Sequence, residues 1–486
     1  MMIGWQFIGP SISRWLVLLG IAVMFALVGC GGGKVSDPAQ VLGDPGQSPA
    51  RHQAAVGIAQ AQLGAKETER LLRRMIAAPG YALESREMAW DALMRLDREG
   101  LARQLEIDLP RLVMPLWRAR ICELIVEETW IEMTPTLIRA WARPSPGFDG
   151  VPEDRPERKA LIAMYGEDQL SKVLVQVMLD ADPIVAANLR ARCWELLMAE
   201  GRRDTVVELL ASAEVDEKDG LFRDLRTITN LTGVVPVNRE EILWARALCA
   251  PENREFLDEI AVVVESLPES RRQEVLEMRD LGVLVGASRL DPELLQLDAS
   301  ELESRLRAKI DTPNRRVYAR DLTGYRGRHS ERLREVLDQL DWGDLLAITV
   351  AAEALQIKPV RSHLFDHAER DLLDKGTEYG GIISIDDQGR FVVLEFPPRR
   401  RNGDSRFEAS QAMFDAGYSG LFHFHHHAQK YDNKESAGPH QGDFLYALAN
   451  RANCLVFTFI DSRTLNADWY RHGGVVVDLG VLRRPD

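Results

Sequence analysis

Cysteine is scarce in this chain, and the few cysteines present do not form a recognisable metal or redox motif. Five occur among 486 residues, and no two stand in the Cys-x-x-Cys spacing that is typical of metal sites. Four of them lie within apolar segments at wide and irregular spacing: Cys122, Cys193, Cys249 and Cys454. We expect these four to be buried free thiols, because free cysteine behaves as a small hydrophobic residue.

A surplus of positive charge is also missing. The formal net charge is −14, from 60 lysines and arginines against 74 aspartates and glutamates. The short basic run Arg399–Arg401 lies between Pro398 and Asn402, which is typical of a solvated loop. Because binding to nucleic acids needs clustered cations that neutralise phosphates, the composition argues against a nucleic-acid partner.

The apolar run at the N-terminus is short for a membrane span, which needs about 20 residues. It covers the fourteen residues Trp15–Val28, follows the charge of Arg14, and has the length of a signal-peptide core. It ends in Leu27-Val-Gly-Cys30, which resembles the lipobox of bacterial lipoproteins. An uncleaved membrane anchor is the alternative, because glycines extend the uncharged stretch to Gly33.

The lipobox resemblance implies a location as well as a modification. It implies that residues 1–30 are a signal peptide, that Cys30 is lipidated, and that the lipid anchors the protein to a membrane of the cell envelope. Gly31 stands where retention in the inner membrane usually needs Asp, so the outer membrane is the default expectation. Residues 31–60, rich in Gly, Pro, Ala, Ser and Gln, are expected to form a flexible tether.

Strand patterns are nearly absent between residues 61 and 356. Apolar residues recur there at three- and four-residue spacing, which predicts an all-α region. The sequence Arg118-Ala-Arg-Ile-Cys-Glu-Leu124 matches Arg190-Ala-Arg-Cys-Trp-Glu-Leu196, and a related segment begins at Arg86. These offsets favour paired helices stacked as a solenoid, and the region resembles HEAT-type repeats.

The sequence pattern changes near residue 357, where strand patterns begin, and residues 357–486 are expected to form an α+β domain. A predicted helix (362–375) precedes a predicted hairpin of two β-rich runs (380–385 and 391–396). Further strands are predicted at 421–427, 455–460 and 475–479, with helices at 407–416 and 442–452. The chain is therefore predicted to be multidomain, with a helical-repeat region followed by an α+β domain.

Histidines cluster in this last domain. The chain has ten, and five fall between His423 and His440. In an extended strand alternate side chains share a face, so His423, His425 and His427 point the same way and two of them can bind one Zn²⁺. Asp443, at a predicted helix start, can supply a third ligand. The open fourth position would then hold water, as in catalytic zinc sites.

These residues resemble the JAMM/MPN (JAB-domain) metallopeptidases. That family has a Glu near a Gly-Gly strand, a His-x-His strand, and a Ser-x-x-Asp at a helix start. This chain has Glu378-Tyr-Gly-Gly-Ile-Ile, then Gly420-Leu-Phe-His423-Phe-His425, then His440-Gln-Gly-Asp443. The resemblance implies that His423, His425 and Asp443 bind zinc. It also implies that Glu378 activates the attacking water and passes its proton to the leaving amine.

The chain departs from the family pattern in two places. His440 stands where the family has the Ser that stabilises the oxyanion, and it could donate the equivalent hydrogen bond or act as a further ligand. The gap between His425 and Asp443 is also longer than usual, and it contains the polar stretch 429–436, a candidate substrate loop. This gap leaves His425 and His427 as the alternative ligand pair, although the Gly-x-x-His-x-His register favours His423 and His425.

Two functions follow from this pattern. The first is a membrane-tethered zinc peptidase or isopeptidase whose helical region recruits protein or peptide substrates. The alternative is a non-enzymatic scaffold lipoprotein with a degenerate metal domain. Retention of Glu378 favours the hydrolase, because a silent site has no physical need for a general base.

Overall fold

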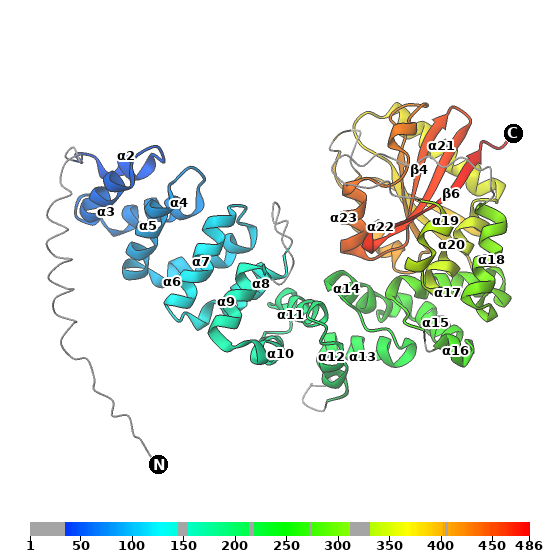
Figure 1. Ribbon diagram of the computed structural model, residues 1–486, viewed down its shortest axis with the longest axis horizontal. Helices are drawn as coiled ribbons and strands as arrows, with labels where there is room; N and C mark the ends of the chain where they lie inside the picture. The colour runs from blue at the N-terminus through cyan, green and yellow to red at the C-terminus, as the bar shows by residue number, and fades with distance from the viewer. Residues whose placement is uncertain are drawn as a thin grey trace, which may run out of the picture. The chain divides into compact units, whose positions relative to one another are not determined.

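The computed structural model describes residues 35–143, 154–212, 218–272, 274–311, 331–401, 403 and 407–486. It divides the chain into two compact units, residues 1–170 and 171–486. The expected signal peptide and Cys30 lie outside the described residues. Helices dominate, and a six-stranded sheet follows them in the chain (Figure 1), which confirms a helical region followed by an α+β part.

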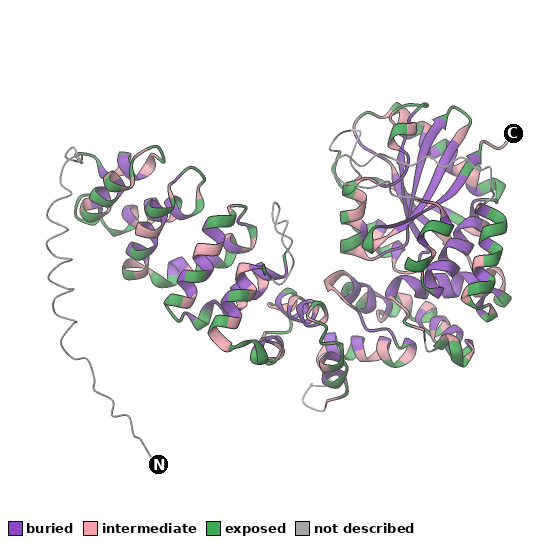
Figure 2. Ribbon diagram, viewed as in Figure 1, coloured by how far each residue is buried: buried purple, intermediate pink, exposed green. Residues whose placement is uncertain are grey.

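The first unit consists of helices in the part that the structure describes. They are α2 (Pro38–Gly43), α3 (Pro49–Leu63), α4 (Ala65–Ala77), α5 (Leu83–Leu96), α6 (Arg98–Asp108), α7 (Pro115–Glu127), α8 (Thr134–Trp141) and α9 (Pro156–Tyr165). Neighbouring helices pack in pairs and share buried aliphatic and tryptophan side chains, while their outer faces are exposed (Figure 2).

The segment expected to be a flexible tether is largely helical in its described part. Asp37 and Ser48 accept hydrogen bonds from backbone N–H groups at the starts of α2 and α3, and each helix has Pro at its beginning. His52 is completely buried and bonds the hydroxyl of Ser85 at 2.8 Å. The alanines and glutamines of this segment are good helix formers, and their small or flexible side chains allow close packing on α4 and α5.

The repeated sequence motif has a structural explanation in a buried arginine. Arg86, Arg118 and Arg190 are at most 3% exposed. Each donates to a backbone carbonyl in the last turn of a neighbouring helix: α4 at 2.6 Å, α8 at 2.8 Å, and α10 (Leu170–Asp180) at 3.0 Å. The last carbonyls of a helix have no partner within it and carry partial negative charge. The motif therefore fastens pairs of helices together.

The second unit contains both helices and the sheet. Its helices after α10 are α11 (Ala187–Ala199), α12 (Arg203–Ala211), α13 (Gly220–Thr232), α14 (Arg239–Leu248), α15 (Arg254–Ser266), α16 (Glu269–Arg272), α17 (Met278–Leu290), α18 (Ala299–Ile310), α19 (Leu333–Val336), α20 (Trp342–Ala354), α21 (Lys358–Leu373), α22 (Gln411–Gly417) and α23 (Gln441–Asn450). The division between compact units thus falls at residue 170, whereas the change from helices to strands follows α21.

The sheet is mixed and has the order β2-β1-β3-β4-β5-β6. Its strands are β1 (Gly380–Ile385), β2 (Phe391–Phe396), β3 (Phe422–His427), β4 (Cys454–Asp461), β5 (Thr464–Arg471) and β6 (Val475–Arg483). β3 and β4 are parallel, and the other neighbouring strands are antiparallel. The predicted hairpin is confirmed with the expected bounds. The strand β5 was not predicted, and α22 is shorter than predicted.

Helices cover both faces and one end of the sheet. On one face α21 packs the ring of Phe365 on Phe459 of β4, with centroids 6.4 Å apart. On the other face lie α22 and α23. α17 closes the end where β1 stops and β3 and β4 start: Arg279 donates to the Asn453 side chain at 3.0 Å, and Gly282 approaches the Gly420 carbonyl. The opposite end of β1 and β3 is left for the site.

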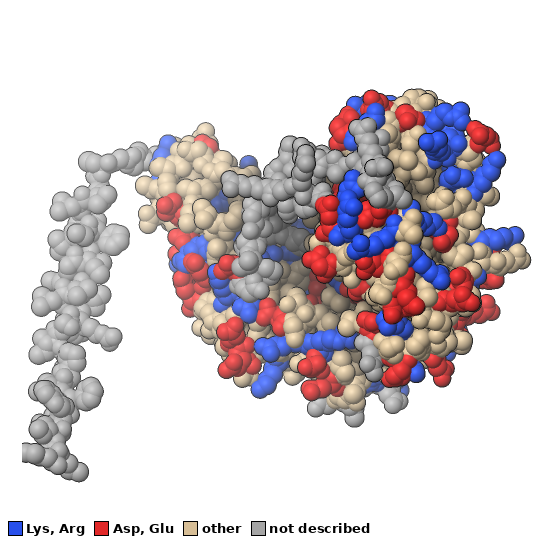
Figure 3. All heavy atoms as spheres, turned by 45° about the vertical axis from the view of Figure 1, so that its right-hand side comes forward, with Lys and Arg blue, Asp and Glu red and all other residues tan. Residues whose placement is uncertain are grey.

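Two further observations concern the surface. Basic and acidic side chains are interspersed over the face shown in Figure 3. Among the described helices, none combines the length and the apolarity that crossing a bilayer requires.

Candidate metal centre

Strand β3 carries four histidines on two faces. His423, His425 and His427 alternate along the strand and therefore share one face, while His426 lies on the other. All four are at least 92% buried, which is unusual for imidazoles. The strand lies in the middle of the sheet, between β1 and β4, so its backbone is held rigidly on both sides.

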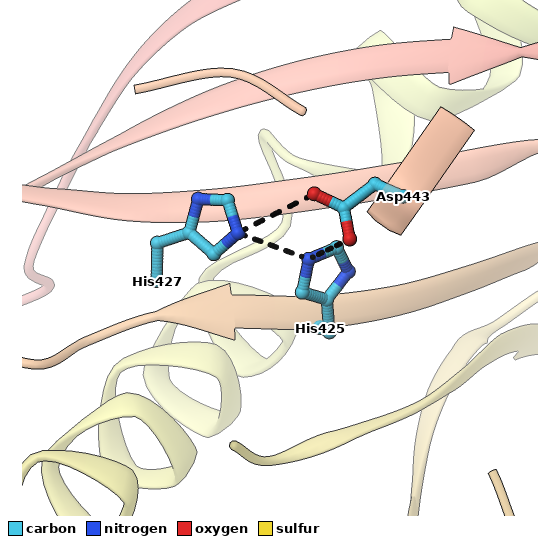
Figure 4. A group of neighbouring side chains, drawn as sticks. All are labelled: His425, His427 and Asp443. Carbon is cyan, nitrogen blue, oxygen red and sulfur yellow. Dashed lines mark hydrogen bonds and ion pairs between the residues drawn. The ribbon is translucent and has the colours of Figure 1, made fainter. Parts of the chain in front are cut away.

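His425 and His427 meet Asp443 at the start of α23 (Figure 4). The Nε2 atoms of the two histidines are 3.2 Å apart. Oδ1 of Asp443 is 3.2 Å from Nε2 of His425, and Oδ2 is 3.5 Å from Nε2 of His427. Two imidazole nitrogens and a carboxylate therefore converge on one point.

These three residues lie close enough together to hold one metal ion. Donor atoms that bind a tetrahedral zinc ion at about 2.0–2.1 Å lie roughly 3.3–3.4 Å from one another. The two nitrogens are 3.2 Å apart, and each lies 3.2 or 3.5 Å from a different oxygen of the Asp443 carboxylate, while one ligand atom from each residue lies within 4.8 Å of the other two. The donor set of two imidazoles and one carboxylate suits Zn²⁺ and also other first-row divalent ions.

A hydrogen bond fixes the tautomer of His427. Its Nδ1 lies 2.8 Å from the backbone carbonyl of Ser436, which can only accept, so Nδ1 carries the proton. In the neutral ring the lone pair is then on Nε2, which faces Asp443. Orientation of a metal-binding imidazole by a carbonyl on its other nitrogen is common in metal sites.

The polar stretch 429–436 makes hydrogen bonds that hold His427 in position. Besides the Ser436 carbonyl, it contributes Asn433, whose side-chain amide donates to the His427 carbonyl at 3.2 Å and to Gln429 at 2.8 Å. The Asn433 backbone N–H in turn donates to Phe459 of β4 at 2.9 Å. These contacts hold His427 in place, and the expected role of the stretch as a substrate loop stays a prediction.

His423, the preferred ligand of the sequence analysis, lies apart from the cluster. Its Nδ1 is 2.7 Å from the hydroxyl of Tyr446 on α23, and its ring also lies near Phe414 of α22. The geometry instead brings together His425 and His427, the alternative pair. The reason is the position of α23. Asp443, in its first turn, faces His425 and His427 at the end of β3, while Tyr446, three residues later on the same side of the helix, faces His423.

Glu378 lies two residues before β1 and faces the same end of β3. In the β1–β3 register Gly380 pairs with His425, and the His426 N–H donates to the Tyr379 carbonyl at 3.0 Å, so Glu378 stands opposite His427. Glu378 is 5% exposed and accepts a hydrogen bond from the Gln429 side chain at 3.1 Å. Sequence reasoning found Glu378 but did not assign Gln429 a role.

The electrostatics of the cluster reflect these contacts. Burial lowers the pKa of His425, but the charge of Asp443, its hydrogen bond and the charge of Glu378 overcome this effect and raise the pKa to about 9. The pKa of Asp443 is raised by burial and lowered more strongly by His425 and His427, so the net shift is well below the usual range. The carboxylate is therefore ionised, as a metal ligand must be.

His440 is the N-terminal capping residue of α23, a role that was not among those expected for it, an oxyanion donor or a further metal ligand. It is the residue before α23: its backbone N–H donates to Asp443 at 2.6 Å, closing a capping box. Its ring lies against that of His427, with centroids 4.2 Å apart and planes tilted by 36°, and it is not among the residues that line the cleft described next. His440 thus holds Asp443 and His427 in position.

A cleft of about 790 Å³ opens beside the cluster. Glu378, His425 and Asp443 line one part of it. The remaining wall is largely apolar or aromatic and includes Phe407, Met413, Phe414, Phe424, Leu445, Tyr446 and Tyr470. Volumes of this size are typical of ligand sites, so a substrate could reach the cluster through this cleft.

Comparisons with known proteins identify no relative. No family model, curated protein or solved structure matches this chain.

Proposed function

We propose that this protein is a metal-dependent hydrolase of peptide or isopeptide bonds, most similar in chemistry to the JAMM/MPN metallopeptidases. The observation that carries the proposal is the convergence of His425, His427 and Asp443 at separations of 3.2–3.5 Å beside Glu378 and an open cleft. A binding-only site has no need for a carboxylate next to its ligands, whereas hydrolysis needs a base.

The order of elements supports the same family. Helix α21, the hairpin of β1 and β2, helix α22, strand β3 with the histidines, helix α23 with Asp443, and strand β4 follow one another as the resemblance implies. The helical pairs joined by repeated arginines similarly support a HEAT-like organisation of the region before them. We propose both as the finer description of the fold.

The residues have separate tasks in this mechanism. A divalent ion, zinc by expectation, would be held by His425, His427 and Asp443, and when bound it polarises a carbonyl and makes water more acidic. Glu378 takes the proton from the attacking water and delivers it to the leaving amine. Gln429 holds the Glu378 carboxylate in place through its side-chain amide.

The cellular setting is part of the proposal. We propose that Cys30 carries a lipid and that the protein faces the periplasm or exterior from an envelope membrane, with the helical region recruiting protein or peptide partners. Cys30→Ala should leave an uncleaved or mislocalised precursor. A mature chain that begins elsewhere than position 30, measured by mass spectrometry, would contradict the anchor.

Activity is tested with the zinc-loaded full chain and a library of peptides and isopeptides, with products read by mass spectrometry. Glu378→Gln is the matched control, because it keeps the size of the side chain but cannot accept a proton. We expect cleavage by the native protein and a fall of roughly 10²–10⁴-fold in the variant, with metal content unchanged. Full zinc content without cleavage of any substrate would favour the scaffold function. His440, which replaces the family's Ser, does not line the cleft, and this observation also favours a scaffold.

A further inference from the structure

The cleft beside the cluster has an apolar half that the proposed chemistry does not use. The ring of Phe414 stacks on that of Tyr446, with centroids 6.3 Å apart and planes 17° from parallel. Met413 lies beneath at 1% exposure, and Leu445 on α23 is 60% exposed at the cleft wall. Leu445 shares this cleft with Glu378, His425 and Asp443, so a ligand bound in the cleft can cover it.

Two glycines let aromatic rings pack closely at the wall of this half of the cleft. A Cβ atom on Gly380 would lie 2.9 Å from the ring of Phe407, so the bare backbone of β1 lets this ring approach the sheet opposite His425. A Cβ atom on Gly417 would lie 2.5 Å from Nε2 of His423. The Cβ atom on Gly380 would also lie 2.6 Å from the Phe424 carbonyl oxygen, so a larger residue there would require the backbone to shift.

We propose that this half of the cleft is a specificity subsite for a large apolar or aromatic side chain next to the scissile bond, with Phe407, Phe414 and Leu445 as its contact residues. The inference rests on the proposed hydrolase function and adds the substrate class. The basis of the inference is that Glu378, His425 and Asp443 line the same cleft as the three contact residues. A substrate peptide with its scissile amide at the cluster would therefore place a neighbouring side chain against the contact residues.

Two leucines on α23 provide a matched pair of variants. Leu445 is 60% exposed and lines the cleft, whereas Leu448 is 58% exposed and does not. Both are exposed on the same helix, so Leu445→Ala and Leu448→Ala should affect folding equally little. Only the first should affect the choice of substrate.

The experiment uses the zinc-loaded full chain and a series of peptides that differ only in the residue on either side of the scissile bond: Phe, Leu, Ala or Asp. We expect kcat/KM for the Phe or Leu peptide to exceed that for Ala by roughly 10–200-fold. Leu445→Ala should reduce this ratio by about tenfold, Phe414→Ala should reduce it further, and Phe414→Leu should restore most of it. Leu448→Ala should leave the ratio unchanged.

Binding of the same peptides to the Glu378→Gln variant, measured by calorimetry, separates the two proposals. Preferential binding of the apolar peptides without hydrolysis by the native protein would overturn the hydrolase but support the subsite. Hydrolysis at equal rates across the series, or equal effects of the two leucine variants, would overturn the subsite alone. The absence of both binding preference and hydrolysis would overturn both.

Discussion

The choice between the two histidine pairs makes a sharp prediction for metal binding. His423 and His427 are both buried, share one face of β3 and are four residues apart, so His423→Ala and His427→Ala should cost similar stability. Of these two histidines, His427 is the one with a ring nitrogen 3.5 Å from Asp443. We therefore expect His427→Ala to lose zinc and His423→Ala to keep it.

The size of the effect follows from the number of ligands. His427 provides one of three protein donors, and loss even of a residue that only orients a ligand lowers metal affinity by about 10–100-fold. Loss of the ligand itself should exceed this range, which corresponds to more than about 2.7 kcal/mol. In His423→Ala the Tyr446 hydroxyl loses its partner, but no donor atom is removed, so the affinity should change by less than about tenfold.

Both affinities are measured on the full chain by competition with a chromophoric zinc chelator, with zinc content after dialysis as a second readout. Circular dichroism confirms that both variants are folded. Equal zinc affinity in His427→Ala and the native protein would refute the assignment. Loss of zinc in His423→Ala with retention in His427→Ala would restore the first pair, and loss in neither would place the site elsewhere.

Three further outcomes follow from particular contacts. Gln429→Leu removes the donor to Glu378, so hydrolysis should fall by about 10–100-fold while zinc content stays constant, which parallel activity and metal assays would check. Arg190→Met removes a buried anchor between helices and should lower the free energy of unfolding by about 2–3 kcal/mol in denaturant titrations; no change would refute the anchoring role. Burial and the charge of Asp478 raise the pKa of Glu331 to about 8 from its usual 4.5. The folded chain thus keeps a proton that the unfolded chain releases, so stability should fall as pH rises from about 4.5 to 8, and Glu331→Gln should flatten this slope; identical slopes would contradict it.

Local patterns predicted most secondary structure of the sheet-containing region. The hairpin Gly380–Ile385 and Phe391–Phe396 has the predicted bounds because continuous apolar runs flank a polar turn. Strand β5 was missed although Leu465, Ala467 and Trp469 alternate with Asn466 and Asp468. Both are completely buried, and the amide of one donates to the carboxylate of the other at 2.8 Å. Asparagine, aspartate and alanine are depleted in strands, so this run lacks the β-rich composition that marked the hairpin.

The segment predicted to be a flexible tether contains helices that its composition did not indicate. Residues 38–60 have few large apolar side chains, so their composition favoured a flexible segment. Helix formation there depends on capping by Asp37 and Ser48 and on the burial of His52 against α5, a contact made over 33 residues of sequence. The Gly, Pro and Ser content that indicated flexibility includes the residues that begin these helices.

By itself the sequence determined the types of residue at the site. It placed histidines on one strand face, an acidic residue at a helix start and a glutamate before a Gly-Gly strand, because strand alternation and capping are local rules. The tertiary structure decided which of them meet. The position of α23 over the end of β3 places Asp443 beside His425 and His427. It also places the hydroxyl of Tyr446 within hydrogen-bond distance of His423. That position depends on packing between distant segments, and a two-residue shift along a strand keeps the same face, so strand alternation alone cannot distinguish the two histidine pairs.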